Sequence, residues 1–113
     1  MLNINDYQKE IEKFMNPDTV ATTETRLVNG CMGCVGEAAE VLEHLKKFLF
    51  HGQDLDRAKM IKELGDCAFY LCETASALEV SMSEVLQTNV DKLNARYKEG
   101  FTVEESKAKN DEV

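Results

Sequence analysis

The chain has 113 residues, of which 43% are hydrophobic, and a formal net charge of −8, so we expect a single domain over residues 1–113 that gains stability by pairing with another copy. The excess of acidic side chains argues against binding to a nucleic-acid polymer, which needs a basic surface. With neither an apolar run of membrane length nor a signal-like leader, we expect a cytoplasmic protein without a membrane partner.

The first predicted helix lies near the N-terminus. Its apolar residues recur at helical spacing: Ile4, Tyr7, Ile11 and Phe14. Pro17 ends this helix, because the residue before a proline avoids helical geometry. Residues 17–25 are rich in threonine without apolar periodicity and are predicted to form a loop.

Two long helices follow, over about residues 26–51 and from about Asp54 to Leu78. Gly52 is the predicted stop of the first, and Asp54 is a possible cap of the second. Both carry apolar stripes at helical spacing. Gly65 lies on the apolar side of the second, where a missing side chain would let a neighbouring helix approach closely.

The pair Ser81 and Glu84 has the spacing of a capping box and predicts a fourth helix that runs to about Tyr97. Thr102 and Glu105 repeat this pattern weakly before a charged tail, residues 102–113, that we expect to be partly frayed. No segment alternates as a strand would. The sequence therefore predicts an all-α, four-helix-bundle-like fold that is completed by oligomerisation.

Paired carboxylates border the apolar stripes of both long helices. Glu37 and Glu40 are three residues apart on one flank, and Glu63 and Asp66 repeat the spacing, with Tyr70 and Glu73 continuing the row. If the helices pack antiparallel, the pairs face each other, and four crowded carboxylates protonate or bind cations. Oxygen ligands in that number suit Mg²⁺ or Mn²⁺.

Two glycines, Gly33 and Gly36, lie on the same flank as the first carboxylate pair. Because glycine inside a helix costs about 1 kcal/mol relative to alanine, they suggest that something comes close to the backbone there. The alternative is that acidic residues three apart are ordinary helix surface, and one such pair among 21 acidic residues means little.

The fourth predicted helix adds a polar and cationic row. Asn89 falls within its apolar stripe, where a buried amide needs a partner, and Lys92 and Arg96 follow along the edge. This row could hold phosphate oxygens, but its cations could equally be solvated arms paired with nearby acids. Lys47, seven residues after Glu40, is a weaker phosphate candidate.

The four cysteines are Cys31, Cys34, Cys67 and Cys72. The first two form a C-x-x-C, but zinc usually needs a second close pair or suitably spaced histidines. We expect reduced, buried thiols that act as small apolar residues.

Taken in order, these segments resemble the MazG-like nucleotide pyrophosphohydrolases, whose motif is E-x-x-E, a variable spacer and E-x-x-D. The matching stretches are Gly33-Cys-Val-Gly-Glu-Ala-Ala-Glu40, Lys62-Glu-Leu-Gly-Asp66 with Tyr70, and Asn89-Val-Asp-Lys-Leu93 with Arg96-Tyr97 and Gly100-Phe101. The resemblance covers about residues 5–101, and the spacer between Glu40 and Glu63 is 22 residues.

The resemblance implies a homodimer or homotetramer that hydrolyses nucleoside triphosphates to monophosphate and pyrophosphate with Mg²⁺, for which Mn²⁺ is a possible substitute. It implies metal ligation and catalysis by the four acids, Glu37, Glu40, Glu63 and Asp66. Substrate contacts are implied for Asn89 and Lys92, with Arg96 and Lys47 as further candidates. One or two ions are open, as is the general base, with Glu40 one candidate.

Two other classes of protein are alternatives. The di-iron bundles need Glu-x-x-His on two helices, whereas Val41 and Phe48 precede His44 and His51 by three residues. The second alternative is a catalytically silent helical adaptor with a solvated acidic surface. Base selectivity depends on pocket walls, which we expect from the 17–25 loop, the first helix and a neighbouring subunit.

Overall fold

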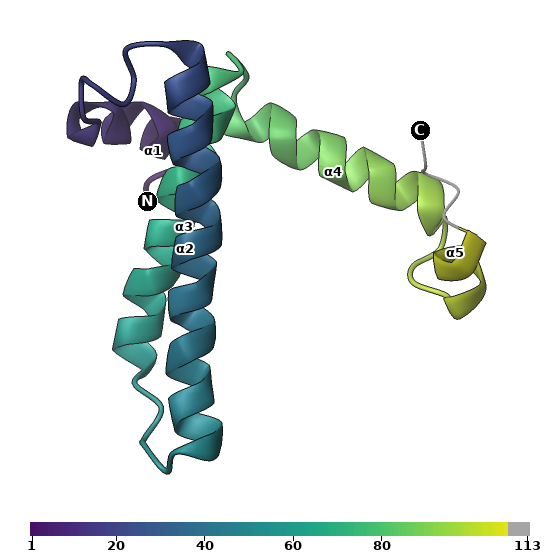
Figure 1. Cartoon of the computed structure of the whole chain (residues 1–113). Helices are drawn as coiled ribbons and strands as arrows, with labels where there is room; N and C mark the ends of the chain where they lie inside the picture. Colours follow the sequence, from purple (N-terminus) through teal and green to yellow (C-terminus); the bar gives the residue numbers. More distant parts are fainter. Residues whose placement is uncertain (109–113) are drawn as a thin grey trace.

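In the computed structural model, which describes residues 1–108, the chain is all-α as predicted. Five α-helices and one 3-10 helix follow in order: α1 Ile4–Glu10, η1 Ile11–Phe14, α2 Thr23–Phe50, α3 Arg57–Ala77, α4 Met82–Arg96 and α5 Val103–Ala108. In Figure 1, α2 and α3 form a long antiparallel hairpin, α1 crosses its upper end, and α4 projects to the side with α5 at its tip. No helix within the described residues is long and apolar enough to cross a membrane.

Polar caps set the ends of the helices. The Thr22 side chain accepts the Thr25 N–H in a capping box, so α2 begins three residues before its predicted start. At the other end Gly52 has a φ of +69°, a conformation that favours glycine, and α2 ends before it as predicted. The cap of α3 is Asp56 and not Asp54, because the Asp56 side chain accepts the Lys59 N–H at 3.0 Å.

The later caps follow the predicted pattern. Ser81 accepts the Glu84 N–H at 3.1 Å at the start of α4. Thr102 accepts the Glu105 N–H at 3.1 Å and so starts α5, which means that the first part of the tail is helical up to Ala108. The remainder of the predicted frayed tail, residues 109–113, lies outside the described residues.

Close contacts at two glycines fix the register of the hairpin. A side-chain carbon at Gly33 would lie 2.2 Å from the Tyr70 ring, and one at Gly30 would lie 2.3 Å from the Thr74 hydroxyl oxygen. Gly65, expected to allow such an approach, has nothing within 4 Å of the corresponding position. The two helices therefore touch through glycines on α2 and not on α3.

The hydrophobic core lies where α1, α3 and the start of α4 meet. The buried hydrophobic residues of the described chain are Ile11, Cys72, Ala75 and Met82. The buried Gln8 fastens this junction, because its amide nitrogen donates to Ser76 and to the Val80 carbonyl while its oxygen accepts the Met82 N–H. This core is small for a chain of this length.

The thiols differ from the expectation of buried apolar residues. All four cysteines are free, but Cys72 alone is buried and Cys31 is exposed. Burial, followed by the neighbouring Cys31 and Cys67, raises the pKa of the Cys34 thiol. A raised thiol pKa lowers the reactive thiolate fraction.

Candidate functional site

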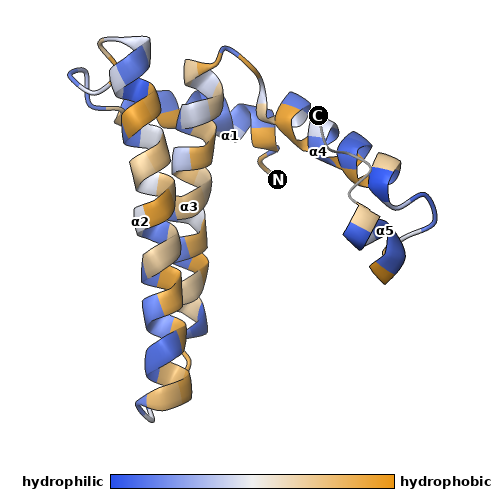
Figure 2. Cartoon of the chain, turned by 45° about the vertical axis from the view of Figure 1, so that its right-hand side comes forward, coloured by the Kyte–Doolittle hydropathy of each residue, from blue (hydrophilic) through white to orange (hydrophobic). Residues whose placement is uncertain are grey.

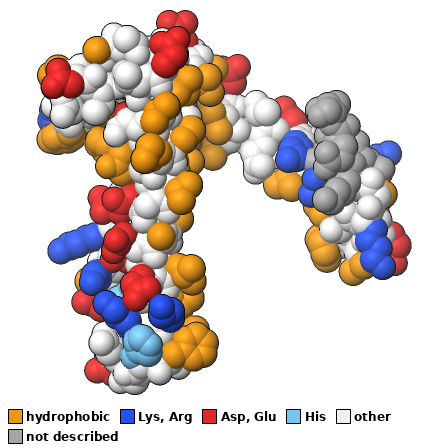
Figure 3. All heavy atoms as spheres, in the orientation of Figure 1, with side chains coloured by type: hydrophobic (Ala, Val, Ile, Leu, Met, Phe, Trp, Pro, Cys, Tyr) orange, Lys and Arg blue, Asp and Glu red, His pale blue; other side chains and the backbone are white. Residues whose placement is uncertain are grey.

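The register of the hairpin brings the two carboxylate pairs opposite each other. Since Gly33 lies against Tyr70, moving one turn along each antiparallel helix places Glu37 across from Asp66, and the next turn places Glu40 across from Glu63. In Figure 3 the lower half of the hairpin shows acidic and basic side chains side by side. The contact between Gly33 and Tyr70, one helical turn away, therefore places the two carboxylate pairs opposite each other.

The carboxyl of Glu37 lies within reach of the charges of the other three acids. Burial, and after it the negative charges of Asp66, Glu40 and Glu63, raise the pKa of the Glu37 carboxyl. Within residues 1–108 none of the four forms an ion pair with a basic side chain. The site therefore concentrates negative charge that the described protein does not itself neutralise.

Glu63 carries the clearest sign of an absent partner. Its side chain is buried, and its Oε2 has no hydrogen-bond partner in the described structure. A buried carboxylate oxygen without a partner is costly, and hard oxygen donors of this kind suit Mg²⁺ or Mn²⁺. No three acidic, histidine or cysteine side chains of the described residues stand in a metal-binding arrangement.

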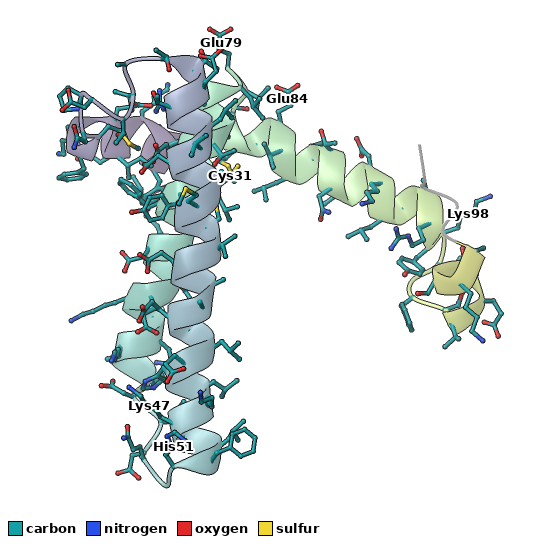
Figure 4. All side chains as sticks on the ribbon, in the orientation of Figure 1. Cys31, Lys47, His51, Glu79, Glu84 and Lys98 are labelled. Atoms are coloured by element: carbon teal, nitrogen blue, oxygen red, sulfur yellow. The ribbon has the colours of Figure 1, made fainter. Side chains whose placement is uncertain are left out.

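A polar hollow of about 300 Å³ opens beside Glu40 and Glu63, near the end of the hairpin. Lys47 and Lys59 line it, and Figure 4 shows Lys47 on the lower part of α2. His44 lies in its wall, where its Nε2 accepts the Asp56 N–H at 3.1 Å, which leaves the proton of a neutral ring on Nδ1. The lining also holds five carboxylates: Glu40, Glu43, Asp54, Asp56 and Glu63. The two lysines are the groups of this hollow that suit phosphate oxygens, and the excess of acids means that a polyphosphate needs further cations to enter.

Lys59 was missed by the sequence analysis. It lies four residues before Glu63 on α3, so helical spacing alone places both side chains on one face. Its partner across the hollow, Lys47, was identified for the same geometric reason.

Comparison with known proteins identifies the family of this chain. A family model described as the MazG nucleotide pyrophosphohydrolase domain matches residues 23–101, a range that contains both carboxylate pairs and both lysines of the hollow. The chain belongs to the MazG family. The resemblance seen in the sequence is thereby confirmed, and with it a nucleotide pyrophosphohydrolase domain in general terms.

One relative of this MazG domain is the Gene 37 protein of Mycobacterium phage L5, which is 37% identical over 73 residues. The match covers 61% of this chain and 64% of the relative, just under two thirds of its length. No solved structure matches the chain.

The MazG domain keeps a second set of predicted residues apart from the carboxylates. Asn89, Lys92 and Arg96 lie on α4, whose main packing partners are α1 and α3 near their junction. Figures 1 and 2 both show α4 leading away from the lower hairpin, where the carboxylates lie. Arg96 rests over the Tyr97 ring at 5.6 Å. Within one chain these three residues do not join the site.

Proposed function

We propose that this chain hydrolyses nucleoside or deoxynucleoside triphosphates to the monophosphate and pyrophosphate, with Mg²⁺ or alternatively Mn²⁺, and thereby removes unwanted nucleotides from the cellular pool. One observation carries the proposal: of two facing carboxylate pairs, one member of each, Glu40 and Glu63, lines a polar hollow that also contains two lysines, and the buried Glu63 Oε2 has no partner among the described residues. A triphosphate needs both a divalent ion and cations around its phosphates.

Glu37, Glu40, Glu63 and Asp66 are the residues that would hold the ion. Bound there, Mg²⁺ would neutralise negative charge and lower the pKa of a coordinated water. Lys47 and Lys59 would then hold the terminal phosphates in the hollow. Because these lysines lie at one end of the carboxylate row, the nucleoside extends towards the other end.

The proton of the attacking water needs an acceptor that solvent and substrate can both reach. Glu40 is exposed and lines the hollow, so we assign it as the general base, in place of a full ligand of the ion. Water forms the new bond to the α-phosphorus, the bond from that phosphorus to the bridging oxygen breaks, and pyrophosphate leaves. The proton passes to Glu40, and Lys47 and Lys59 offset the charge on the leaving group.

Exposed apolar side chains support a homodimer or homotetramer. On α2, Val28, Val35, Leu42 and Leu49 follow one another at intervals of seven, the spacing of a helix–helix seam. All four are exposed, Val35 by 73%, and the hydrophobic stripe along α2 is plain in Figure 3. This heptad seam faces away from α3, so within one chain it has no helix to cover it, and a patch of this length is rare on a monomer.

A second copy would also give α4 a role. The apolar face of α4 is half exposed and contains Val85, Leu86, Val90 and Leu93, which Figure 2 shows as hydrophobic bands along the helix. Burying this face against another copy would order the neighbouring Asn89, Lys92 and Arg96. We propose that these residues contact substrate phosphate in the carboxylate site of a partner subunit.

The test is the release of pyrophosphate and monophosphate from a panel of canonical, oxidised and methylated triphosphates, with Mg²⁺ or Mn²⁺. Glu40→Gln and Asp66→Asn should lower the rate by about 10²–10⁴-fold, while the helical circular dichroism and the melting profile stay intact. Glu84→Gln, which removes an exposed charge on α4, is the matched control and should keep full activity.

Two results would overturn the proposal. One is that no triphosphate is consumed with either metal, which would favour the silent helical adaptor. The other is that both amide variants remain fully active, which would remove the carboxylates from catalysis.

A further inference from the structure

A second hollow, of about 280 Å³, lies between η1, the turn after it, α2 and α3. Aromatic rings form much of its wall: Phe14, Phe69 and Tyr70. Phe69 and Tyr70 meet edge to face with ring centroids 5.2 Å apart, and Phe14 at the rim is 64% exposed. Aromatic rings around an open hollow suit a flat, partly apolar ligand.

This hollow lies at the opposite end of the carboxylate row from the lysines. Asp66, Tyr70 and Glu73 follow at intervals of four and three on α3, so they share one side of the helix. The rise from Asp66 to Glu73 is roughly 10 Å, a gap that a ribose can bridge. A nucleotide with its phosphates near the lysines therefore has its base directed here.

The closed end of the hollow offers only hydrogen-bond acceptors. The amide nitrogen of Asn29 donates to both oxygens of Glu73, at 2.8 and 3.0 Å, which fixes the amide so that its own oxygen also remains an acceptor. Glu73 is 0% exposed and pairs with no basic side chain among residues 1–108. An ionised carboxylate has about four acceptor sites, and Asn29 leaves part of that capacity unused.

A structural link between α2 and α3 does not require this carboxylate. Glutamine at position 73 would accept the same Asn29 hydrogen bond, and burying an amide costs less than burying an unpaired charge. The carboxylate is therefore better explained by a ligand that brings further N–H donors.

We propose that this hollow binds the nucleobase, and that Glu73 and Asn29 select bases whose pairing edge presents N–H donors. Guanine fits best, because its N1–H and N2 amino group stand side by side and match the two oxygens of a carboxylate. Thymine and uracil fit worst, because their carbonyl oxygens would face the acceptors of Glu73 and Asn29. Because Glu73 is 0% exposed in this structure, the proposal requires the rim at Phe14 to move outward when a base binds. This inference rests on the proposed triphosphate chemistry.

The decisive variant is Glu73→Gln, which keeps the shape and the Asn29 hydrogen bond but replaces one acceptor by a donor. For the unaltered protein, kcat/KM should be about a hundredfold higher for dGTP than for dTTP, because mismatched buried polar groups are strongly rejected. Glu73→Gln should lower kcat/KM for dGTP by a similar factor and leave that for dTTP unchanged or raised. Glu84→Gln, with the same charge change on the surface, should alter neither.

A binding measurement separates this inference from the proposed function. Calorimetric titration with dGMP and dTMP without metal should show binding of dGMP to the unaltered protein and its loss in Glu73→Gln. If this holds while no triphosphate is consumed, the base site stands and the proposed hydrolysis fails. If triphosphates are hydrolysed without base preference, or Glu73→Gln slows all of them equally, the hydrolysis stands and the base site is wrong.

A second variant keeps the test open if Glu73→Gln fails to fold. Phe14→Ala removes an exposed ring at the rim of the hollow, outside the hydrophobic core. It should lower the affinity for dGMP about tenfold, the usual effect of losing one stacking partner. An unchanged affinity for dGMP in this variant would show that the base does not stack on the aromatic rings of the hollow.

Discussion

The α2–α3 hairpin and the α4 arm show two different relations between helix and site. In the hairpin, close contacts between Gly33 and Tyr70 fix the register within the chain, so the carboxylates meet without help. The α4 arm has an equally regular helix and apolar face, yet that face is half exposed and carries its polar residues away from the hairpin. The hairpin brings its carboxylates together within one chain. The apolar face of α4, in contrast, is not covered by the described residues of the same chain.

The prediction with the largest expected effect asks whether α4 contributes residues to the carboxylate site of a partner subunit. Lys92→Ala and Glu40→Gln should each abolish most activity when purified alone. When the two proteins are mixed and allowed to exchange subunits, half of the dimers are mixed, and each of these has one intact site. Activity should then recover to about a quarter of the unaltered protein, measured as pyrophosphate release.

If α4 serves its own chain, every site in the mixture contains one defect and no activity returns. The heptad seam gives the control for assembly. Leu42→Glu should lower the mass measured by light scattering, and a mixture prepared in this background should recover nothing. An unchanged mass in Leu42→Glu would show that the seam is not the interface.

The sequence predicted most of the hairpin because the determining signals are local. Apolar spacing, the positive φ at Gly52 and the Ser81 cap each act within one or two turns. The opposition of Glu37 and Asp66 was predictable for the same reason, since a short connection leaves two helices few ways to pack. The cap at Asp56 was misplaced by two residues because both aspartates have suitable side chains and the choice depends on the His44 contact across the hairpin.

The position of α4 could not be predicted from its own residues. Its apolar stripe indicates that one face becomes buried, but not whether the covering helix belongs to the same chain. Asn29 was missed for a related reason. Its role depends on a hydrogen bond to Glu73, which lies 44 residues later in the chain. Such long-range pairs leave no periodic signal.

A smaller effect should distinguish two glycines of the hairpin. Alanine at Gly33 would meet the Tyr70 ring at 2.2 Å and should destabilise the fold by about 1–3 kcal/mol. Gly36 has nothing within 4 Å of the added carbon, so Gly36→Ala should stabilise the helix by up to about 1 kcal/mol. Urea unfolding of both variants gives the comparison, and equal effects would mean that the register does not depend on the Gly33 contact.

The smallest expected effect concerns the charge of the hairpin. Because the pKa of Glu37 is raised in the folded state, the metal-free fold binds its proton more tightly than the unfolded chain does. The stability from this group is therefore present at low pH and is lost as pH rises through the folded pKa. Added Mg²⁺ should act in the opposite direction, because it binds the ionised form and stabilises the fold by mass action.

The Mg²⁺-induced rise in melting temperature should accordingly be a few degrees at neutral pH and shrink on acidification. Glu37→Gln should raise the melting temperature of the metal-free protein at neutral pH, since it relieves repulsion from Asp66, Glu40 and Glu63, and should reduce the Mg²⁺ increment. A variant that melts lower without metal, or an increment that grows in acid, would show that the carboxylates are solvated independently. The α4 residues provide the contrast, because Lys92→Ala should leave the increment and its pH dependence unchanged.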